Sequence, residues 1–312
     1  MPHAPTTPRP AVVRFGPALP GLPAVLARSP VRAGTDLARA NGALVTFGAD
    51  PGALATGIAD AELLRWVQLP TAGIELFADA LDARPDLVWT SAKGAYARPV
   101  AEHALMLTLA VLRDLPRRVT ARTWQRRSGT SLHGLRVVVI GAGGVALETV
   151  RLLKTFRTHV TVVRRLALPV DAADRTVVQE HLGSVLPDAD VVVVAAALTD
   201  ATRGLLSRDA LALLRPTAVL VNVGRGALID TDALVDALRR RRLRGAGLDV
   251  TDPEPLPDGH PLWDEPRCIV TPHTADTQEM IEPLYLDRIR INLAAFAAHR
   301  DLIGRVDVAA GY

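Results

Sequence analysis

Short apolar runs alternate with helix-like segments through the second half of the chain, and this rhythm restricts the fold more than any other feature. Each run is a continuous stretch rich in Val, Ile, Leu or Ala. Such strands are typical of a parallel sheet covered by helices on both faces, because neither face meets water. The predicted strands are Leu135–Ile140, His159–Val163, Asp190–Ala195, Ala218–Val223, Gly245–Val250 and Cys268–Thr271.

The helix-like segments and the chain length predict two domains. A chain of 312 residues is too long for one compact core. The run from Val100 to Leu112 is apolar almost all round, which suits a buried helix. The first hundred residues read as a smaller α/β unit, and the helical segment from Thr277 to His299 is expected to pack back on it. We therefore predict a discontinuous domain of residues 1–97 and 279–312, and a second domain of residues 98–278.

A glycine cluster follows the first strand of the larger sheet. It reads Gly141-Ala-Gly143-Gly144-Val-Ala146, a match to the pattern G-x-G-x-x-G/A. The first glycine allows a tight turn, the second admits a pyrophosphate close to the backbone, and Ala146 is small enough for helix–strand packing. The same letters could form only a tight strand–helix turn. Their place between a strand and a helix, with a second strand after, favours a Rossmann-type dinucleotide site.

The end of that second strand predicts which dinucleotide binds. An acidic residue there would accept hydrogen bonds from the ribose 2′-hydroxyl of NAD. This chain instead has Arg164 and Arg165. A guanidinium pairs well with a phosphate, so the sequence favours NADP(H), with NAD(H) possible. The alternative is that both guanidiniums face solvent and that the choice of cofactor is loose.

Three later stretches place polar residues after predicted strands. Arg225 follows one strand, Asp249 ends the next, with Glu254 in a proline-rich loop behind it, and His273 follows the last. In open α/β sheets the ligand crevice lies at these carboxyl ends. A guanidinium can hold a substrate carboxylate, and a histidine is the natural proton carrier near neutral pH. Each residue alone has an ordinary structural explanation, but together they predict a hydride-transfer site.

With these motifs the chain resembles the D-isomer-specific 2-hydroxyacid dehydrogenases, which include glyoxylate/hydroxypyruvate reductases. The resemblance runs from about Ala43 to Arg300 and is carried by VAEHAL (Val100–Leu105), GAGGVA (Gly141–Ala146), LTDATRGLL (Leu198–Leu206), VNVGRGALID (Val221–Asp230), GLDVTDPEPLPDGHPLW (Gly247–Trp263) and TPHTA (Thr271–Ala275). It implies a doubly wound Rossmann-type domain and a smaller flavodoxin-like substrate domain.

The resemblance also implies residue roles. Arg225, Glu254 and His273 fall on the family's catalytic Arg–Glu–His. The substrate carboxylate would meet Ala72 and Gly73, with Lys93 as a further cation. The implied cofactor-binding residues are Gly141, Gly143, Gly144, Val145, Arg164, Arg165, Ala196, Thr202, Val223 and Asp249. Asp276 departs from the family, which commonly has glycine there.

The expected function is NADPH-preferring reduction of a small 2-oxo acid to a D-2-hydroxy acid. Two alternatives stay open: a non-catalytic NAD(P)-binding regulator, and a dehydrogenase of another small anion, such as phosphite, on the same fold. The sequence does not select the 2-oxo acid. We expect no metal in the site.

The composition of the chain limits which partners and which cellular compartment we expect. The single cysteine, Cys268, excludes a disulfide framework. With a net charge of +3 and one dense basic run, Arg239–Arg242, we expect no nucleic-acid partner. No secretion signal or membrane span is expected, so a cytoplasmic location is predicted. The resemblance and the apolar helix at Val100–Leu112 predict a homodimer, in which Trp124 is a candidate to reach the partner's active site.

Overall fold

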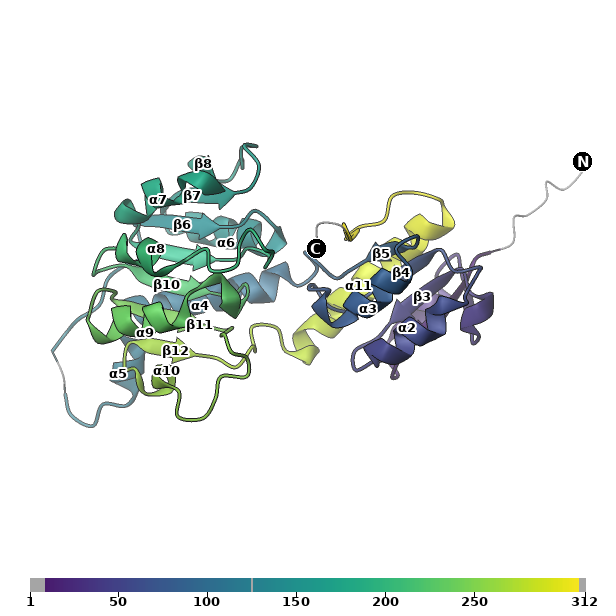
Figure 1. Cartoon of the computed structure of the whole chain (residues 1–312), viewed down its shortest axis with the longest axis horizontal. Helices are drawn as coiled ribbons and strands as arrows, with labels where there is room; N and C mark the ends of the chain where they lie inside the picture. The colour runs from purple at the N-terminus through teal and green to yellow at the C-terminus, as the bar shows by residue number, and fades with distance from the viewer. Residues whose placement is uncertain (1–8, 125, 309–312) are drawn as a thin grey trace, which may run out of the picture. The chain divides into compact units, whose positions relative to one another are not determined.

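The computed structural model describes residues 9–124 and 126–308 and divides into two compact units. Unit 1 comprises the chain up to Tyr96 and from Gln278 onward, and unit 2 comprises Ala97–Thr277 (Figure 1). Each unit has its own sheet and its own buried core.

Unit 1 is built on a five-stranded parallel sheet, counted over the described residues, in the order β2-β1-β3-β4-β5. This is the flavodoxin-like strand order. Its strands are β1 (Ala11–Phe15), β2 (Arg32–Gly34), β3 (Gly42–Val45), β4 (Trp66–Gln68) and β5 (Val88–Thr90). Its helices are α1 (Leu22–Ala27), α2 (Pro51–Ala59), α3 (Ala78–Ala83) and α11 (Gln278–Ala297).

Helix α11 closes the core of unit 1, although it follows unit 2 in the chain. Tyr285, Ile289 and Leu293 recur at helical spacing and are fully buried in a core cluster with β1, β3 and β4 residues. The Tyr285 hydroxyl donates to the Val45 carbonyl at 2.5 Å. Beyond the helix, the chain returns along β5, where the Val306 N–H donates to the Trp89 carbonyl at 2.9 Å.

Unit 2 is built on a seven-stranded parallel sheet, again within the described residues, in the order β12-β11-β10-β9-β6-β7-β8. The strand order reverses between β6 and β9, which is the point where doubly wound folds bind ligands. The strands are β6 (Arg136–Ile140), β7 (His159–Arg164), β8 (Arg175–Val178), β9 (Val191–Val194), β10 (Val219–Asn222), β11 (Gly245–Leu248) and β12 (Cys268–Val270).

The helices of unit 2 cover both faces of this sheet. They are α4 (Ala97–Leu112), α5 (Leu115–Val119), α6 (Gly144–Lys154), α7 (Leu182–Val185), α8 (Arg208–Ala212), α9 (Thr231–Arg239) and α10 (Pro261–Asp264). Two separate apolar clusters line the sheet, one with α6 and α4 and one with α8 and α9. The strands β9, β10 and β11 are buried at every position, which explains why they are apolar except for Asn222 at the end of β10.

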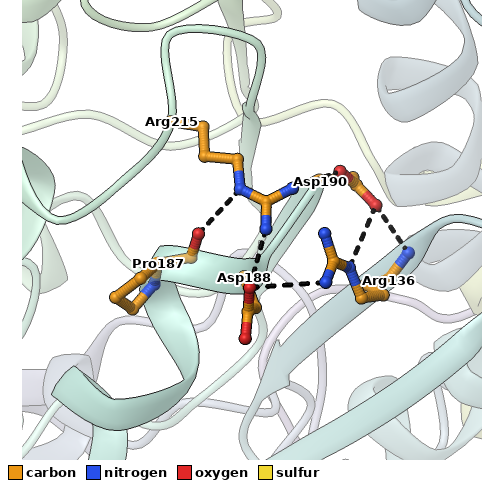
Figure 2. Close-up of polar contacts among 5 residues, drawn as sticks. All are labelled: Arg136, Pro187, Asp188, Asp190 and Arg215. Carbon is orange, nitrogen blue, oxygen red and sulfur yellow. Dashed lines mark hydrogen bonds and ion pairs between the residues drawn. The ribbon is translucent and has the colours of Figure 1, made fainter.

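Four charged side chains tie together the amino-terminal edge of this sheet (Figure 2). Asp190, just before β9, accepts from the backbone N–H of Arg136 at 2.9 Å. Arg215 donates to Asp188 at 2.7 Å and to the Pro187 carbonyl at 2.8 Å. The network lies at the opposite edge from the glycine loop, so it supports the sheet without entering the ligand crevice.

The predicted fold class is confirmed, and all six strands predicted for the larger sheet are present. Beyond these six strands, the larger sheet contains the unpredicted strand β8, and the smaller sheet contains the similar strand β2. Both are short and begin with an arginine, so neither gives a long apolar run. In the described part of the chain, no helix is long and apolar enough to cross a membrane.

An ion pair between Lys154 and Asp174 anchors the start of the edge strand β8, and it should make the stability of the protein depend on pH. Lys154 at the end of α6 donates to Asp174 at 2.7 Å, and the Val160 N–H donates to the same carboxylate at 2.7 Å. The hydrogen bond from Lys154 is the main cause that holds the pKa of Asp174 below its usual range. A depressed carboxyl pKa contributes stability that is present above about pH 4 and is lost as pH falls through the folded-state pKa.

We expect Asp174→Asn to lower the melting temperature at pH 7, by an amount equivalent to about 1 kcal/mol or less because the pair is half exposed. The difference from the wild type should shrink below about pH 4. Differential scanning calorimetry from pH 3 to pH 8 measures it, with the exposed Asp258→Asn as control. A difference that stays constant with pH would contradict the assignment.

Candidate active site

The glycine loop forms the turn between β6 and α6. Gly141 has φ +117°, and a Cβ there would lie 2.5 Å from the Ala195 carbonyl oxygen, so no other residue fits. At Gly143, which caps α6, a Cβ would meet nothing within 4 Å. The loop therefore packs tightly on the β9 side and is open at the start of the helix, where free N–H groups would face a ligand. This arrangement fits a dinucleotide pyrophosphate.

The two arginines lie where the sequence predicts them. Arg164 is the last residue of β7, and its Nη1 donates to the Leu168 carbonyl at 3.1 Å. Arg165 follows and is exposed. Both arginines thus lie at the carboxyl edge of the sheet, two strands away from β9 and beside the glycine loop's strand β6.

The ends of β9 and β10 approach each other closely. A Cβ at Gly224 would lie 2.9 Å from the Ala196 carbonyl oxygen, and Val223 beside it is buried. The Thr202 hydroxyl closes the following turn, donating to the Ala197 carbonyl and accepting from the Thr199 N–H, each at 2.8 Å. Ala196 thus follows β9, which borders the switch point, Val223 follows the next strand β10, and the hydroxyl of Thr202 shapes the loop.

Hydrogen bonds with Asn222 fix the position of the Arg225 backbone. The buried side chain of Asn222 donates to the Arg225 carbonyl at 2.9 Å and accepts from the Gly224 N–H at 3.0 Å. The next residue must be glycine, because a Cβ at Gly226 would lie 1.9 Å from the carbonyl carbon of Thr251. This contact seats the loop after β10 directly against the loop after β11.

The loops after β11 and β12 bring a carboxylate and an imidazole together. His273 Nδ1 lies 2.6 Å from Glu254 Oε1, and both side chains are about two-fifths exposed. Because an ionised carboxylate only accepts, Nδ1 carries a hydrogen and Nε2 is the ring nitrogen left for other chemistry. His273 itself has φ +52°, a left-handed conformation that is strained for a residue with a side chain.

Asp249 is buried beneath this loop, with its side chain 2% exposed. Its carboxylate accepts from the Thr271 hydroxyl at 2.6 Å and from the backbone N–H groups of Thr274 and Ala275 at 3.0 and 3.1 Å. Burial raises the pKa of Asp249, but hydrogen bonds from His103, Thr271 and Thr274 outweigh it and the pKa is lowered. The residue is therefore a buried anion with several protein donors.

Asp276 adds a carboxyl that the family pattern lacks. Burial is the main cause that raises its pKa, and the charge of Asp249 acts in the same direction. His273 and Arg225 oppose the shift through their positive charges. The cationic and anionic groups of the candidate site therefore influence one another across the three loops.

The remaining predicted site residues lie in unit 1. The Thr71 hydroxyl donates to the Gly73 carbonyl at 2.6 Å, and the Ala92 N–H donates to the Thr71 carbonyl at 2.8 Å, which joins the Ala72–Gly73 turn to the segment that carries Lys93. Burial lowers the pKa of Lys93, against the opposing charge of Asp307. Unit 1 thus places a turn with small residues beside a half-buried cation.

Sequence reasoning missed three supporting residues: His103, Asn222 and Thr271. The signal for Asn222 was a polar residue at the end of an otherwise apolar strand, and that for His103 was a polar residue on an apolar helix. Over the residues that the structure describes, no three or more His, Cys, Asp or Glu side chains gather as a metal site would require.

Comparison with protein families identifies the chain. Residues 103–275 match the model of the D-isomer specific 2-hydroxyacid dehydrogenase NAD binding domain. This match covers more than half of the chain and nearly all of unit 2. The chain belongs to the D-isomer specific 2-hydroxyacid dehydrogenase family, as the sequence motifs indicate.

Individual relatives share much of the sequence of this chain. The chain is 39% identical over 257 residues to an uncharacterized Corynebacterium melassecola protein in the proB 3′ region, covering 80% of this chain and 84% of that one. It is 34% identical over 225 residues to D-3-phosphoglycerate dehydrogenase of Mycobacterium tuberculosis, covering 69% of this chain but only 42% of that enzyme.

Among solved structures, a D-isomer specific 2-hydroxyacid dehydrogenase from Xanthobacter autotrophicus Py2, in complex with NADPH and MES, is similar over 97% of this chain and 100% of that one. The TM-score is 0.84 and the sequence identity is 26%.

Proposed function

We propose that this protein is an NADPH-preferring reductase that converts small 2-oxo acids into D-2-hydroxy acids. The observation that carries the proposal is the 2.6 Å contact between His273 and Glu254 at the carboxyl edge of a dinucleotide-type sheet, with the Arg225 loop packed against the same loop system. A proton carrier, its carboxylate partner and a cation are the groups that reduction of a 2-oxo acid requires.

The cofactor would lie along the glycine loop, with its pyrophosphate at Gly143–Gly144. Arg164 and Arg165 would pair with the 2′-phosphate, since no carboxylate stands there to bind a free 2′-hydroxyl. The Xanthobacter relative, which was crystallised with NADPH, supports this preference. When bound, the nicotinamide supplies the hydride.

The protein's own residues handle the proton and the substrate. Glu254 accepts from His273 Nδ1–H, which orients the ring so that Nε2–H can donate to the oxygen that develops negative charge. Arg225 would hold the substrate carboxylate and polarise the neighbouring carbonyl group. In the reverse direction, neutral His273 accepts the proton.

We assign the substrate-carboxylate turn to Ala72 and Gly73, with Lys93 as an additional cation, and thus a substrate-binding role to unit 1. Small residues in that turn leave the backbone accessible. Lys93 is partly buried, which lowers the pKa of its ammonium group and reduces the screening of its charge by water, so this cation would attract a small anion.

A homodimer is part of this proposal. The outward face of α4 and its neighbours α5 and α6 form an almost wholly apolar groove of about 510 Å³. The lining includes Met106, Leu109 and Leu115, and large apolar surfaces of this kind mark interaction sites. We propose a second copy of the chain as the occupant, and Trp124, which is fully exposed, as the residue that reaches the partner's site.

The reaction is tested by initial rates of NADPH and NADH oxidation with glyoxylate, hydroxypyruvate, pyruvate and phenylpyruvate. We expect NADPH to be preferred and His273→Asn to lower kcat by about 100-fold or more, because general acid catalysis is lost. The exposed His181→Asn is the matched control. Turnover of phosphite with NADP⁺ but of no 2-oxo acid would support the other-anion alternative. Cofactor binding without turnover of any substrate would support the regulator.

The cofactor preference is tested by the double variant Arg164→Ala, Arg165→Ala. We expect the KM for NADPH to rise by about tenfold or more, since charge-assisted bonds to phosphate are lost, and the KM for NADH to stay the same. Arg175→Ala, at the opposite end of the neighbouring strand, is the control. An equal change for both cofactors would contradict a 2′-phosphate site.

The dimer is tested by light scattering coupled to size exclusion. We expect a mass of twice the 33.3 kDa chain, and a monomer for Met106→Glu, because the variant places a charge in the apolar groove. A monomeric wild type at micromolar concentration would reject the proposal.

A further inference from the structure

We propose that His103, on helix α4, is a positioning residue for the reaction: it donates a hydrogen bond beneath the Thr271–Ala275 loop and thereby keeps His273 directed at Glu254. This inference rests on the proposed function for its catalytic consequence. The sequence motif VAEHAL contains His103, and no step of the mechanism above uses it.

Helix α4 reaches the loop because it lies directly on β11. A Cβ at Gly245 would lie 2.7 Å from the Val111 side chain, and a Cβ at Gly247 would lie 2.8 Å from Leu107. Helix and strand therefore run in opposite directions in close contact. Four helical residues advance about 6 Å and two strand residues about 6.6 Å, so the two repeats stay in step. The next pair in this series is His103 with Asp249.

The contacts of His103 agree with that placement. Its Nε2 lies 2.9 Å from the Thr271 hydroxyl oxygen and 3.3 Å from Asp249 Oδ1. The His103 side chain is 14% exposed. An imidazole on a largely apolar helix is thus turned inward onto a buried carboxylate.

The number of available hydrogens fixes which group donates in the contacts of His103 with Thr271 and Asp249. The Thr271 hydroxyl has one hydrogen, and it points to Asp249 Oδ1 at 2.6 Å. The hydroxyl oxygen can therefore only accept from His103, and the carboxylate also only accepts. Nε2 of His103 must carry the hydrogen, which it shares between the two oxygens.

Asp249 links His103 to the loop that carries His273, because it accepts hydrogen bonds from the backbone of that loop. Its main-chain carbonyl accepts from the His273 N–H at 2.8 Å, and its carboxylate accepts from the N–H groups of Thr274 and Ala275. Three consecutive loop amides thus end on one residue. A left-handed histidine persists only where its surroundings fix it, and this set of bonds does so. Without the donor from α4, the buried anion loses a partner and the loop loosens.

The experiment compares His103→Leu, which removes the donor, with His103→Gln, whose amide can restore it. We expect His103→Leu to lower kcat by about tenfold or more, as small misplacements of catalytic groups do, with the KM for NADPH unchanged. Amides 273–275 should exchange with solvent about tenfold or more faster. His103→Gln should recover both values. Thr108→Val, a buried change on the same helix whose hydroxyl bonds only within α4, is the control.

Hydrogen exchange separates this inference from the proposed function, because it needs no turnover. Faster loop exchange in His103→Leu, restored in His103→Gln, supports the inference even if no 2-oxo acid is reduced. Unchanged exchange and kcat in His103→Leu would overturn it, as would equal loss in the Leu and Gln variants, which would indicate packing alone. If His103→Leu does not fold, Thr271→Val removes the same bridge from the other side and should also speed exchange.

Discussion

The candidate site depends on the hydrogen bonds that the buried carboxylate of Asp249 accepts. A charge withdrawn from water is unfavourable unless hydrogen bonds replace its hydration. Here the replacements come from a helix, a hydroxyl and the backbone of the loop that carries His273. The loop therefore acquires its shape by satisfying the anion. His273 and Glu254, whose side chains are partly exposed, owe their contact to a residue that is itself buried.

Helix α4 can bring His103 to the Asp249 carboxylate only because β11 has glycines where the helix crosses it. Gly245 and Gly247 leave room for Val111 and Leu107, and the helix lies closer to the sheet than ordinary side chains allow. Packing and chemistry are thus coupled through one helix. The inward face of α4 supplies apolar burial along most of its length, and His103 supplies a hydrogen-bond donor where the strand ends.

The sequence predicts the parts of this protein that follow from local periodicity. Strand ends are visible as the ends of apolar runs, so Arg225, Glu254 and His273 could be found and expected to converge. The role of His103 could not, because it depends on which strand the helix crosses and in what register, and no local pattern encodes that. Nor could β8, whose four residues become a strand only by pairing with β7.

The discontinuity of unit 1 has a consequence for how the chain is made. Its five strands are translated first, but α11, whose Tyr285, Ile289 and Leu293 fill its core, is translated after all of unit 2. An uninterrupted unit can begin folding while synthesis continues, whereas the divided one must wait for its last helix. During that interval the apolar face that α11 will cover is open to water. The core of unit 1 is therefore open to aggregation until α11 has been synthesised.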